Sequence, residues 1–303
     1  MKWVSLMSGE LGTLIQLLLR SLETGSVYAL AALGIIIVFR TSLITHFAQG
    51  SMGMFNTFLV TTLVVSFAVP LWAAMLCGAV SAVICGFLVD FFIIRRAKRV
   101  TPVGRQIITL GLIMIFLGLA PMVFGVDPLL LPRFITGGDF RIPGLGASIS
   151  HNAVLNISIG LVLMGTLFYI LQKTKLGLAV RVTASNEPTA RLMGVPTRTV
   201  TLLAWAVAGV LGMLSGVMIA PATTVTVTLM NIVQVNALFA CVLGGFQTFY
   251  GPVIAAYIIG IGNNLLVYYV SSVWGGQIMY LLILIFLIFR PNGLVGKKYV
   301  KKV

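Results

Sequence analysis

The chain has 303 residues, of which 59% are hydrophobic and 9% are charged, and its mean hydropathy is +1.09. A soluble globular domain is about one quarter charged, so this chain has too few polar residues to cover a surface that faces water. At about 20 residues per span, its apolar tracts suffice for about eight to ten transmembrane helices. A membrane β-barrel is excluded because tracts such as residues 107–124 are continuously apolar, whereas barrel strands alternate. We therefore expect an all-α, polytopic integral membrane protein in which residues 1–303 form a single transmembrane domain.

The expected spans follow one another along the chain. In order, they cover residues 11–40, 51–70, 72–94, 105–126, 152–172, 200–220, 231–248, 252–272 and 276–290. The first tract would be about 45 Å long as a helix, which is more than a bilayer needs. It forms either one tilted helix or two elements broken around residues 20–23, and the two alternatives place the N-terminus on opposite sides. Small-residue spacings at Ala82 and Gly86, and at Gly212 and Gly216, predict close contacts between helices.

Basic residues determine the expected topology. The formal net charge is +14, and most Lys and Arg residues fall at residues 95–105, 173–198 and 290–302. The positive-inside rule places these three groups in the cytosol, including the loop at 173–199 and a basic tail at 290–303, and places residues 127–141 outside. The groups lack the interleaved aromatic side chains of a nucleic-acid-binding surface. We therefore expect contact with membrane lipid and no nucleic-acid partner.

Acidic residues near the ends of two spans are expected to form ion pairs. Asp90 precedes Arg95 and Arg96 by little more than one helical turn, which predicts a pair at the cytosolic edge of the membrane. Arg20 and Glu23 are expected to pair in the same way. A proton path is the alternative for either acid, but it would require more than one central acidic residue.

The sequence offers little for catalysis or metal binding. Cys77, Cys85 and Cys241 occur singly within apolar tracts, and the two histidines, His46 and His151, are predicted on opposite sides of the membrane. A Gly-rich phosphate-binding motif ending in Gly-Lys-Ser/Thr is absent from the sequence. We therefore expect no enzyme activity, no metal site and no cofactor, and no nucleotide-phosphate binding by the chain itself.

The loop at 173–199 contains the most informative local pattern. Asn186 or Ser185 can cap a helix, Glu187 suits its first turn and Gly194 ends it, which leaves about two turns. A helix this short is unstable on its own. Four apolar side chains are expected to be exposed on it among basic residues: Ala190, Leu192, Met193 and Val195. Two interpretations stay open, namely a plug for a groove in a partner protein and an interfacial helix lying on lipid headgroups.

Four segments resemble one family of transporters. Residues 186–195 are similar to the coupling helix of permease subunits in ATP-binding-cassette importers. Residues 40–50, 242–252 and 289–296 resemble signature segments of branched-chain amino acid permeases, in the same order and spacing, so that the resemblance covers roughly residues 20–298. His46 and Ser51 depart from the family, which usually has Asn and an acidic residue there. These departures bear on which solute is carried and not on the class of transporter.

The resemblance implies the membrane subunit of an importer in the bacterial inner (plasma) membrane. Its partners would be a second permease subunit, identical or paralogous, two cytosolic ATP-binding-cassette ATPases and an extracytoplasmic substrate-binding protein. The solute would be a branched-chain or other amino acid, or a related small solute such as urea or an amide. Alternatives are a passive small-solute channel, which has no use for an apolar cytosolic plug, and the permease of a sugar importer. The coupling residues would be Asn186, Glu187, Ala190, Arg191, Leu192, Met193 and Gly194.

Polar residues within the spans are candidates for the substrate pathway. One group lies around a glycine-containing break between two spans, and a second is expected to enter from outside. The break predicts either a re-entrant element that lines the pathway or an ordinary cytosolic turn. Asn263 and Asn264 are better explained as hydrogen-bonding contacts between helices, and His46 could serve the same purpose. The candidate pathway residues are His46, Gln49, Ser51, Asn56, Asn231, Gln234 and Asn236.

Overall fold

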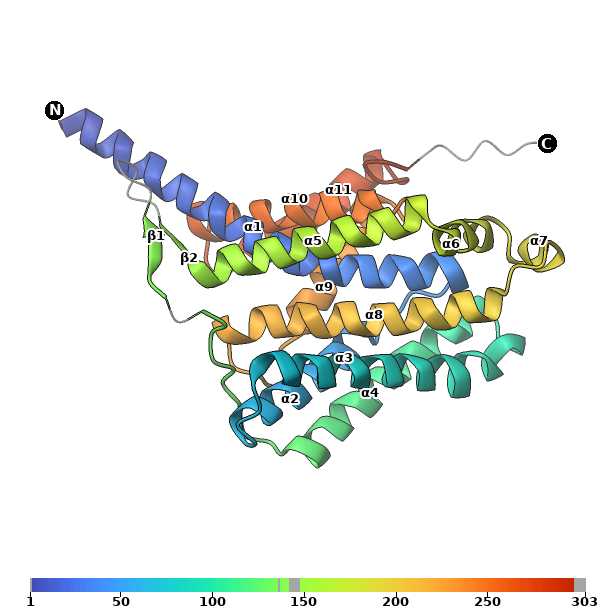
Figure 1. Cartoon of the computed structure of the whole chain (residues 1–303). Helices are drawn as coiled ribbons and strands as arrows, with labels where there is room; N and C mark the ends of the chain where they lie inside the picture. The colour runs from blue at the N-terminus through green and yellow to red at the C-terminus, as the bar shows by residue number, and fades with distance from the viewer. Residues whose placement is uncertain (1, 136, 142–147, 297–303) are drawn as a thin grey trace.

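A computed structural model describes residues 2–135, 137–141 and 148–296 as a helical membrane domain. Most helices lie roughly side by side along one direction (Figure 1). A two-stranded hairpin lies at one end of the bundle, and α6 and α7 lie at the other. The elements are α1 (Lys2–Ser42), α2 (Gln49–Val65), α3 (Leu71–Leu88), η1 (Val89–Ile94), η2 (Arg96–Arg99), α4 (Pro102–Phe124), β1 (Asp139–Arg141), β2 (Ser148–Ser150), α5 (His151–Lys173), α6 (Lys175–Ser185), α7 (Glu187–Leu192), α8 (Thr197–Ile219), η3 (Ala220–Ala222), α9 (Asn231–Gly244), α10 (Tyr250–Tyr269) and α11 (Gly275–Phe289).

The expected spans each correspond to a helix, although not all are long enough to cross a bilayer alone. Within the described residues, 6 helices are long and apolar enough to do so: Glu10–Ser42, Leu71–Ile94, Val103–Phe124, His151–Lys173, Thr197–Ala222 and Tyr250–Tyr269. The shorter ones are α2 with 17 residues, α9 with 14 and α11 with 15. The prediction of an all-α polytopic membrane protein is confirmed.

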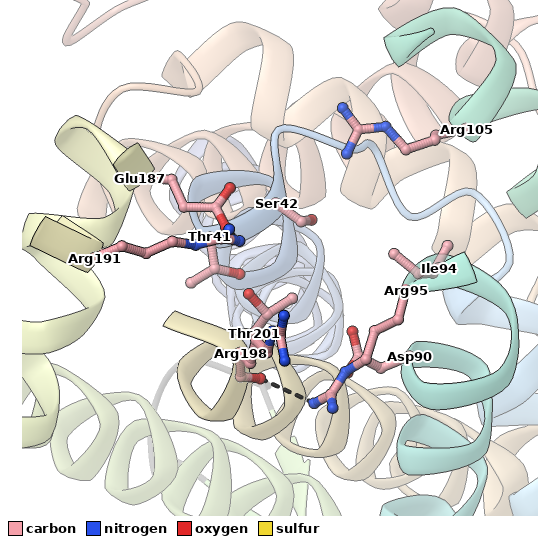
Figure 2. A pocket seen from close by; sticks show the side chains of 10 residues that line it. All are labelled: Thr41, Ser42, Asp90, Ile94, Arg95, Arg105, Glu187, Arg191, Arg198 and Thr201. Carbon is pink, nitrogen blue, oxygen red and sulfur yellow. Dashed lines mark hydrogen bonds and ion pairs between the residues drawn. The ribbon is translucent and has the colours of Figure 1, made fainter. Parts of the chain in front are cut away.

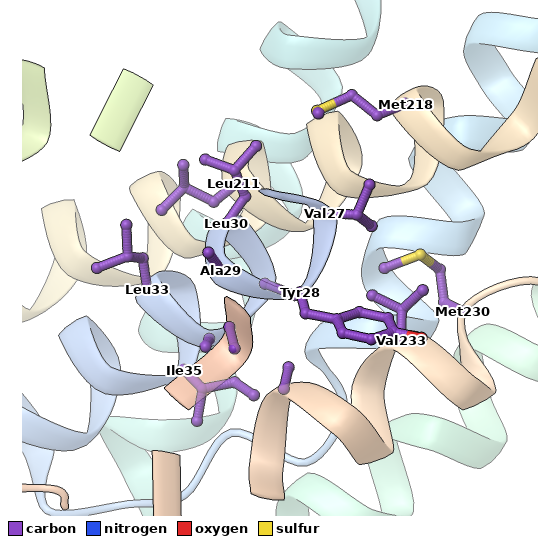
Figure 3. Close-up of a cluster of buried hydrophobic side chains, with 14 of the residues drawn as sticks. Val27, Tyr28, Ala29, Leu30, Leu33, Ile35, Leu211, Met218, Met230 and Val233 are labelled. Atoms are coloured by element: carbon purple, nitrogen blue, oxygen red, sulfur yellow. The ribbon is translucent and has the colours of Figure 1, made fainter. Parts of the chain in front are cut away.

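The first helix runs through the middle of the bundle. α1 is continuous over 41 residues, so the alternative of two elements broken around residues 20–23 is wrong. Its N-terminal end lies with the hairpin, at the outer end of the bundle (Figure 1). Between residues 25 and 38, α1 is buried on all sides by α5, α8, α9 and α10, which fits a helix that is apolar all round. Figure 3 shows Leu30 of α1 beside Leu211 of α8, and Tyr28 of α1 beside Val233 of α9.

Small residues allow α2, α3 and α8 to pack closely, as their spacing predicts. A Cβ atom on Gly53 of α2 would lie 2.6 Å from the carbonyl oxygen of Gly212 on α8. A Cβ atom on Gly86 of α3 would lie 2.6 Å from the carbonyl oxygen of Trp205 on α8. These distances are too short for any side chain, so the backbones themselves are in contact.

The two segments expected on opposite sides of the membrane lie at opposite ends of the bundle. The described part of the outward segment, including β1 and β2, lies at the end of the bundle opposite α7 (Figure 1). The basic loop at 173–199 is at the other end, taken here as cytosolic. Of the basic tail at 290–303, residues 297–303 lie outside the described residues.

Candidate functional site

The short helix in the loop at 173–199 forms as its caps predict. Oδ1 of Asn186 accepts a hydrogen bond from the backbone N–H of Thr189 at 3.1 Å, and Glu187 lies in the first turn. At the other end, Gly194 has a φ of +80°, the left-handed conformation that glycine adopts without a steric penalty. α7 is therefore a defined helical segment of 6 residues that projects from the bundle (Figure 1).

The preceding segment is a second helix that the sequence analysis did not predict. α6 begins after Thr174, whose hydroxyl accepts a hydrogen bond from the N–H of Gly177 at 3.2 Å. A capping threonine followed by apolar residues three and four apart, such as Leu176, Ala179 and Val180, was the available signal. α6 supports α7 because the two helices are in contact.

The exposed surface of the short helix and its C-terminal end differs from the expectation at two residues, because Ala190 is buried and Val195 is half-buried. Leu192 and Met193 are 89% and 73% exposed, as predicted, but Ala190 is fully buried at 0%. The expectation that Ala190 is exposed is therefore wrong. Its small side chain faces the chain itself, where α7 packs against α6 and the start of α8, and its carbonyl accepts a hydrogen bond from the N–H of Val195 at 3.0 Å. Within residues 187–195, only Leu192 and Met193 are largely exposed apolar side chains.

Arg191 links α7 to α8 by a hydrogen bond. Its guanidinium forms an ion pair with Glu187 on the same helix, and its Nε donates to Oγ1 of Thr197 at 2.9 Å. Thr197 is buried at the first residue of α8. Glu187 and Arg191 therefore connect α7 to the membrane domain of their own chain.

A cavity of about 270 Å³ lies between α7 and the cytosolic ends of α1, α4 and α8 (Figure 2). Opposite α7, Arg95 donates from Nε to Oδ2 of the buried Asp90 at 2.8 Å, which confirms the ion pair predicted there. Arg95 also donates to the backbone carbonyl of Arg198 at 3.0 Å, which links the π-helical turn η1 to α8. The lining residues are Thr41, Ser42, Asp90, Ile94, Arg95, Arg105, Glu187, Arg191, Arg198 and Thr201.

This arrangement connects the short helix to several membrane helices. The Arg191 bond to Thr197 and the Arg95 bond to the carbonyl of Arg198 both act on the first turn of α8. A displacement of α7 would therefore move the start of α8, and through Arg95 it would pull on the ion pair with Asp90. Because packed helices shift between discrete arrangements and do not deform continuously, such a connection can transmit a switching motion.

Between α1 and α2 the chain turns back into the bundle. Gln49, the first residue of α2, donates from Nε2 to the carbonyl of Ala31 at 3.0 Å. Ala31 precedes the end of α1 at Ser42 by about three turns, or roughly 16 Å at 1.5 Å per residue. Residues 43–48 therefore run back alongside α1 as non-helical backbone, and a simple turn at the membrane surface does not describe them. Such backbone is tolerated within a membrane only where protein or water satisfies it.

The two predicted polar groups meet at this break. Gln234 of α9 donates from Nε2 to the carbonyl of His46 at 3.4 Å. The imidazole of His46 is fully buried, with its ring centroid 4.3 Å from that of Trp205. No described residue gives a hydrogen-bond partner to either ring nitrogen of His46, to Nε1 of Trp205 or to Oε1 of Gln49. His46 therefore packs against α8 without donating the helix-to-helix hydrogen bond that was considered for it.

The other candidate pathway residues are more dispersed. Asn56 and Asn236 are buried, and each donates to a carbonyl of its own helix, on Met52 and Ile232 respectively. Ser51 is half-buried and Asn231 is exposed. Four cavities formed by described residues, of about 270, 780, 400 and 360 Å³, are lined by none of the seven candidates.

Comparison with known proteins assigns the family. The sequence model described as "Branched-chain amino acid transport system / permease component" matches residues 17–288. The chain belongs to this family. It is therefore a transport component and not an enzyme, which agrees with the resemblance of the four segments and with the multi-pass helical structure.

Individual relatives are similar over nearly their full length. The probable branched-chain amino acid transport permease protein LivH of Methanocaldococcus jannaschii is 27% identical over 90% of this chain and 89% of that protein. The high-affinity branched-chain amino acid transport system permease protein LivH of Escherichia coli is 23% identical over 98% and 100%. BraD, a permease of the same description from Pseudomonas aeruginosa, is 26% identical over 95% and 98%. The solved structure of PsaBC from Streptococcus pneumoniae in complex with Fab has a TM-score of 0.47 at 12% identity, which is too low to carry any inference.

Proposed function

We propose that this chain is the permease subunit of an ATP-binding-cassette importer for branched-chain or similar amino acids in the inner (plasma) membrane. Its partners would be a second permease subunit, two cytosolic ATPases and an extracytoplasmic binding protein. The names of its relatives support the amino acid substrate. The observation that supports coupling is the tip of α7, where Leu192 and Met193 are exposed while Ala190 and Arg191 hold the helix from behind.

In this proposal each residue of the coupling segment has a distinct task. Asn186 and Gly194 set the two ends of the helix, and Glu187 with Arg191 fixes it to α8. Leu192 and Met193 insert into a groove of the ATPase, since an apolar tip of this size gains free energy by leaving water.

The mechanism is a two-state switch biased by the ATPase. Closure of the ATPases around ATP would displace α7, and the bonds to Thr197 and to the carbonyl of Arg198 would carry the displacement to α8 and η1. The polar cluster around His46 would then open, because its unpaired buried groups are better satisfied when water or solute reaches them. The cluster and its neighbours on α9 would line the inner part of the pathway.

Charge substitutions at the tip of α7 test the proposal. Replacing Leu192 and Met193 together with Glu should release the ATPase subunits during co-purification, because unpaired charges would be buried in the groove. The matched control is Leu176→Glu, since Leu176 is also an exposed leucine of the cytosolic loop, at 56%. If the double variant retained its ATPases and its ATP hydrolysis still responded to the loaded binding protein, α7 would instead be an interfacial helix.

A further inference from the structure

A larger cavity lies at the opposite, outer end of the bundle. Its volume is about 780 Å³, which falls within the range of sites that hold small ligands. It lies between α1, β2, α5, η3 and the end of α10. The lining residues are Gln16, Leu17, Leu19, Arg20, Glu23, Thr24, Arg133, Asp139, Ser148, Ile149, Ser150, Asn152, Ala153, Pro221, Ala222, Asn264, Val267, Tyr268 and Ser272.

Two opposite charges face this cavity from one helix without pairing. Arg20 and Glu23 lie three residues apart on α1, a spacing at which side chains are neighbours and an ion pair was expected. The structure contradicts that expectation, because the ion pairs found among the described residues include neither of them. Glu23 instead accepts a hydrogen bond at Oε1 from Nδ2 of Asn156 at 2.8 Å.

Asn156 holds the carboxylate of Glu23 in place. Its side chain is fully buried on α5, and the same Nδ2 also donates to the carbonyl of Met218 on α8 at 3.1 Å. Nearby, Nδ2 of Asn264 donates to Oγ of Ser21 at 3.0 Å, which fixes α10 to α1 as expected of a contact between helices. The wall that presents Glu23 is therefore tied to three other helices.

The rest of the wall combines charge of both signs with aliphatic surface. Arg133 and Asp139 lie on the outer rim, and neither forms an ion pair with another described residue. Leu17, Ile149 and Val267 supply apolar lining. A site with a cation and an anion that form no ion pair with a described residue, and with an aliphatic wall, complements a solute that carries both charges and an aliphatic side chain.

We propose that this cavity binds a zwitterionic amino acid with an aliphatic side chain at the outer end of the permease. Arg20 contacts the carboxylate, Glu23 contacts the ammonium group, and the aliphatic wall contacts the side chain. Glu23 is half-buried, which strengthens its contact with the ammonium group relative to water, whereas Arg20 is exposed. The inference rests on the proposed import of amino acids and adds to it that the permease has its own recognition site, separate from the binding protein.

The test is binding of radiolabelled L-leucine to the purified complex of permeases and ATPases in nanodiscs, without the binding protein. L-isoleucine, L-valine and L-alanine are measured in parallel. Saturable binding is expected, and Arg20→Gln and Glu23→Gln should each weaken it about tenfold or more. Asp127→Asn is the matched control. Asp127 is an exposed acid of the outward segment after α4, and it does not line the cavity.

Competition by an analogue separates recognition from a general loss of structure. 4-Methylpentanoate has the carboxylate and side chain of leucine but no ammonium group. Wild-type complex should prefer leucine over this analogue, and Glu23→Gln should remove most of the preference because a neutral amide does not attract a cation. A variant that is merely misfolded would lose binding of both.

Several outcomes would overturn the inference. Absence of saturable binding for all four amino acids would do so, as would binding that neither variant changes. If the variants altered only the stimulation of ATP hydrolysis by the binding protein, the cavity would be a docking surface for that protein. ATP-driven uptake in proteoliposomes is measured separately, so that intact uptake without Glu23-dependent binding rejects this site alone. If the wild-type protein neither associates with ATPases nor supports uptake, the proposed function itself is rejected.

Discussion

The tip of α7 and the polar break around His46 place their side chains in opposite kinds of unfavourable surroundings. At the tip, Leu192 and Met193 are apolar and exposed. At the break, His46 and Gln49 are polar and buried, with ring nitrogens or an amide oxygen that no described residue satisfies. Exposed apolar surface is relieved by a protein partner, whereas buried unpaired polar groups are relieved by water or solute. The two regions thus require different ligands, and we assign coupling to the first and permeation to the second.

The largest effect is expected from Ala190→Glu, which tests whether α7 is held by its own chain. A carboxylate at this buried position would detach α7 from α6 and α8, at a cost of about 3 kcal/mol or more. Limited proteolysis of the isolated permease should then cut within the loop at 173–199. Leu192→Glu should leave that loop protected in the isolated permease, because Leu192 is exposed and holds no contact that keeps α7 in place. Equal protection of both variants would contradict the burial of Ala190.

Gln49→Leu should separate transport from assembly at the polar break. The substitution removes the hydrogen bond to the carbonyl of Ala31, a structural loss of about 1 kcal/mol. We expect uptake to fall about tenfold, which corresponds to about 1.4 kcal/mol in the transport barrier, while the amount of assembled complex stays unchanged. Ser158→Ala, on the exposed face of α5, is the control. A parallel loss of assembly and uptake would show that Gln49 only holds helices together.

His46→Phe should have a smaller effect on uptake. Phenylalanine can keep the contact with the ring of Trp205, so the free energy of unfolding should change by less than about 1 kcal/mol. If the ring nitrogens meet water or solute in the open state, uptake should fall about threefold to fivefold. Uptake equal to that of the wild type would make His46 a packing residue and weaken the contrast with α7.

Gly194→Ala should give the smallest effect. An added Cβ meets no atom within 4 Å, so the cost comes only from the left-handed backbone, at about 1 kcal/mol. Stimulation of ATP hydrolysis by the binding protein should fall by less than about twofold, since the partner can restore the end of the helix. Gly165→Ala is the matched control, because Gly165 is equally unobstructed but has no positive φ. A similar loss in the control would mean that the backbone conformation at Gly194 is unimportant.

Local patterns predicted the helices well and the contacts between them less well. The apolar tracts located the spans because lipid requires long apolar helices, and Asn186 and Gly194 located α7 because caps act within one turn. The burial of Ala190 could not be predicted, because in a helix of two turns any residue can face its own chain. α6 was missed although Thr174 and the spacing that follows it were visible in the sequence.

The remaining differences depend on residues that are distant in the sequence. Glu23 was expected to pair with Arg20, but it is bound by Asn156, 133 residues further along the chain. Gln234 meets the carbonyl of His46 across 188 residues. Neither contact follows from periodicity, spacing or charge order, because each depends on how α1 is surrounded by helices that come later.

The central position of α1 also constrains how the protein is made. Ribosomes add about 5–20 residues per second, and α8 begins at Thr197, roughly 150 residues after α1 ends at Ser42, so α1 is complete roughly 8–30 s before α8 begins to emerge. In water, a helix that is apolar all round would aggregate during such a delay. In the bilayer, acyl chains solvate it until α8, α9 and α10 arrive to replace them. The element at the centre of the final structure can therefore be the first one synthesised.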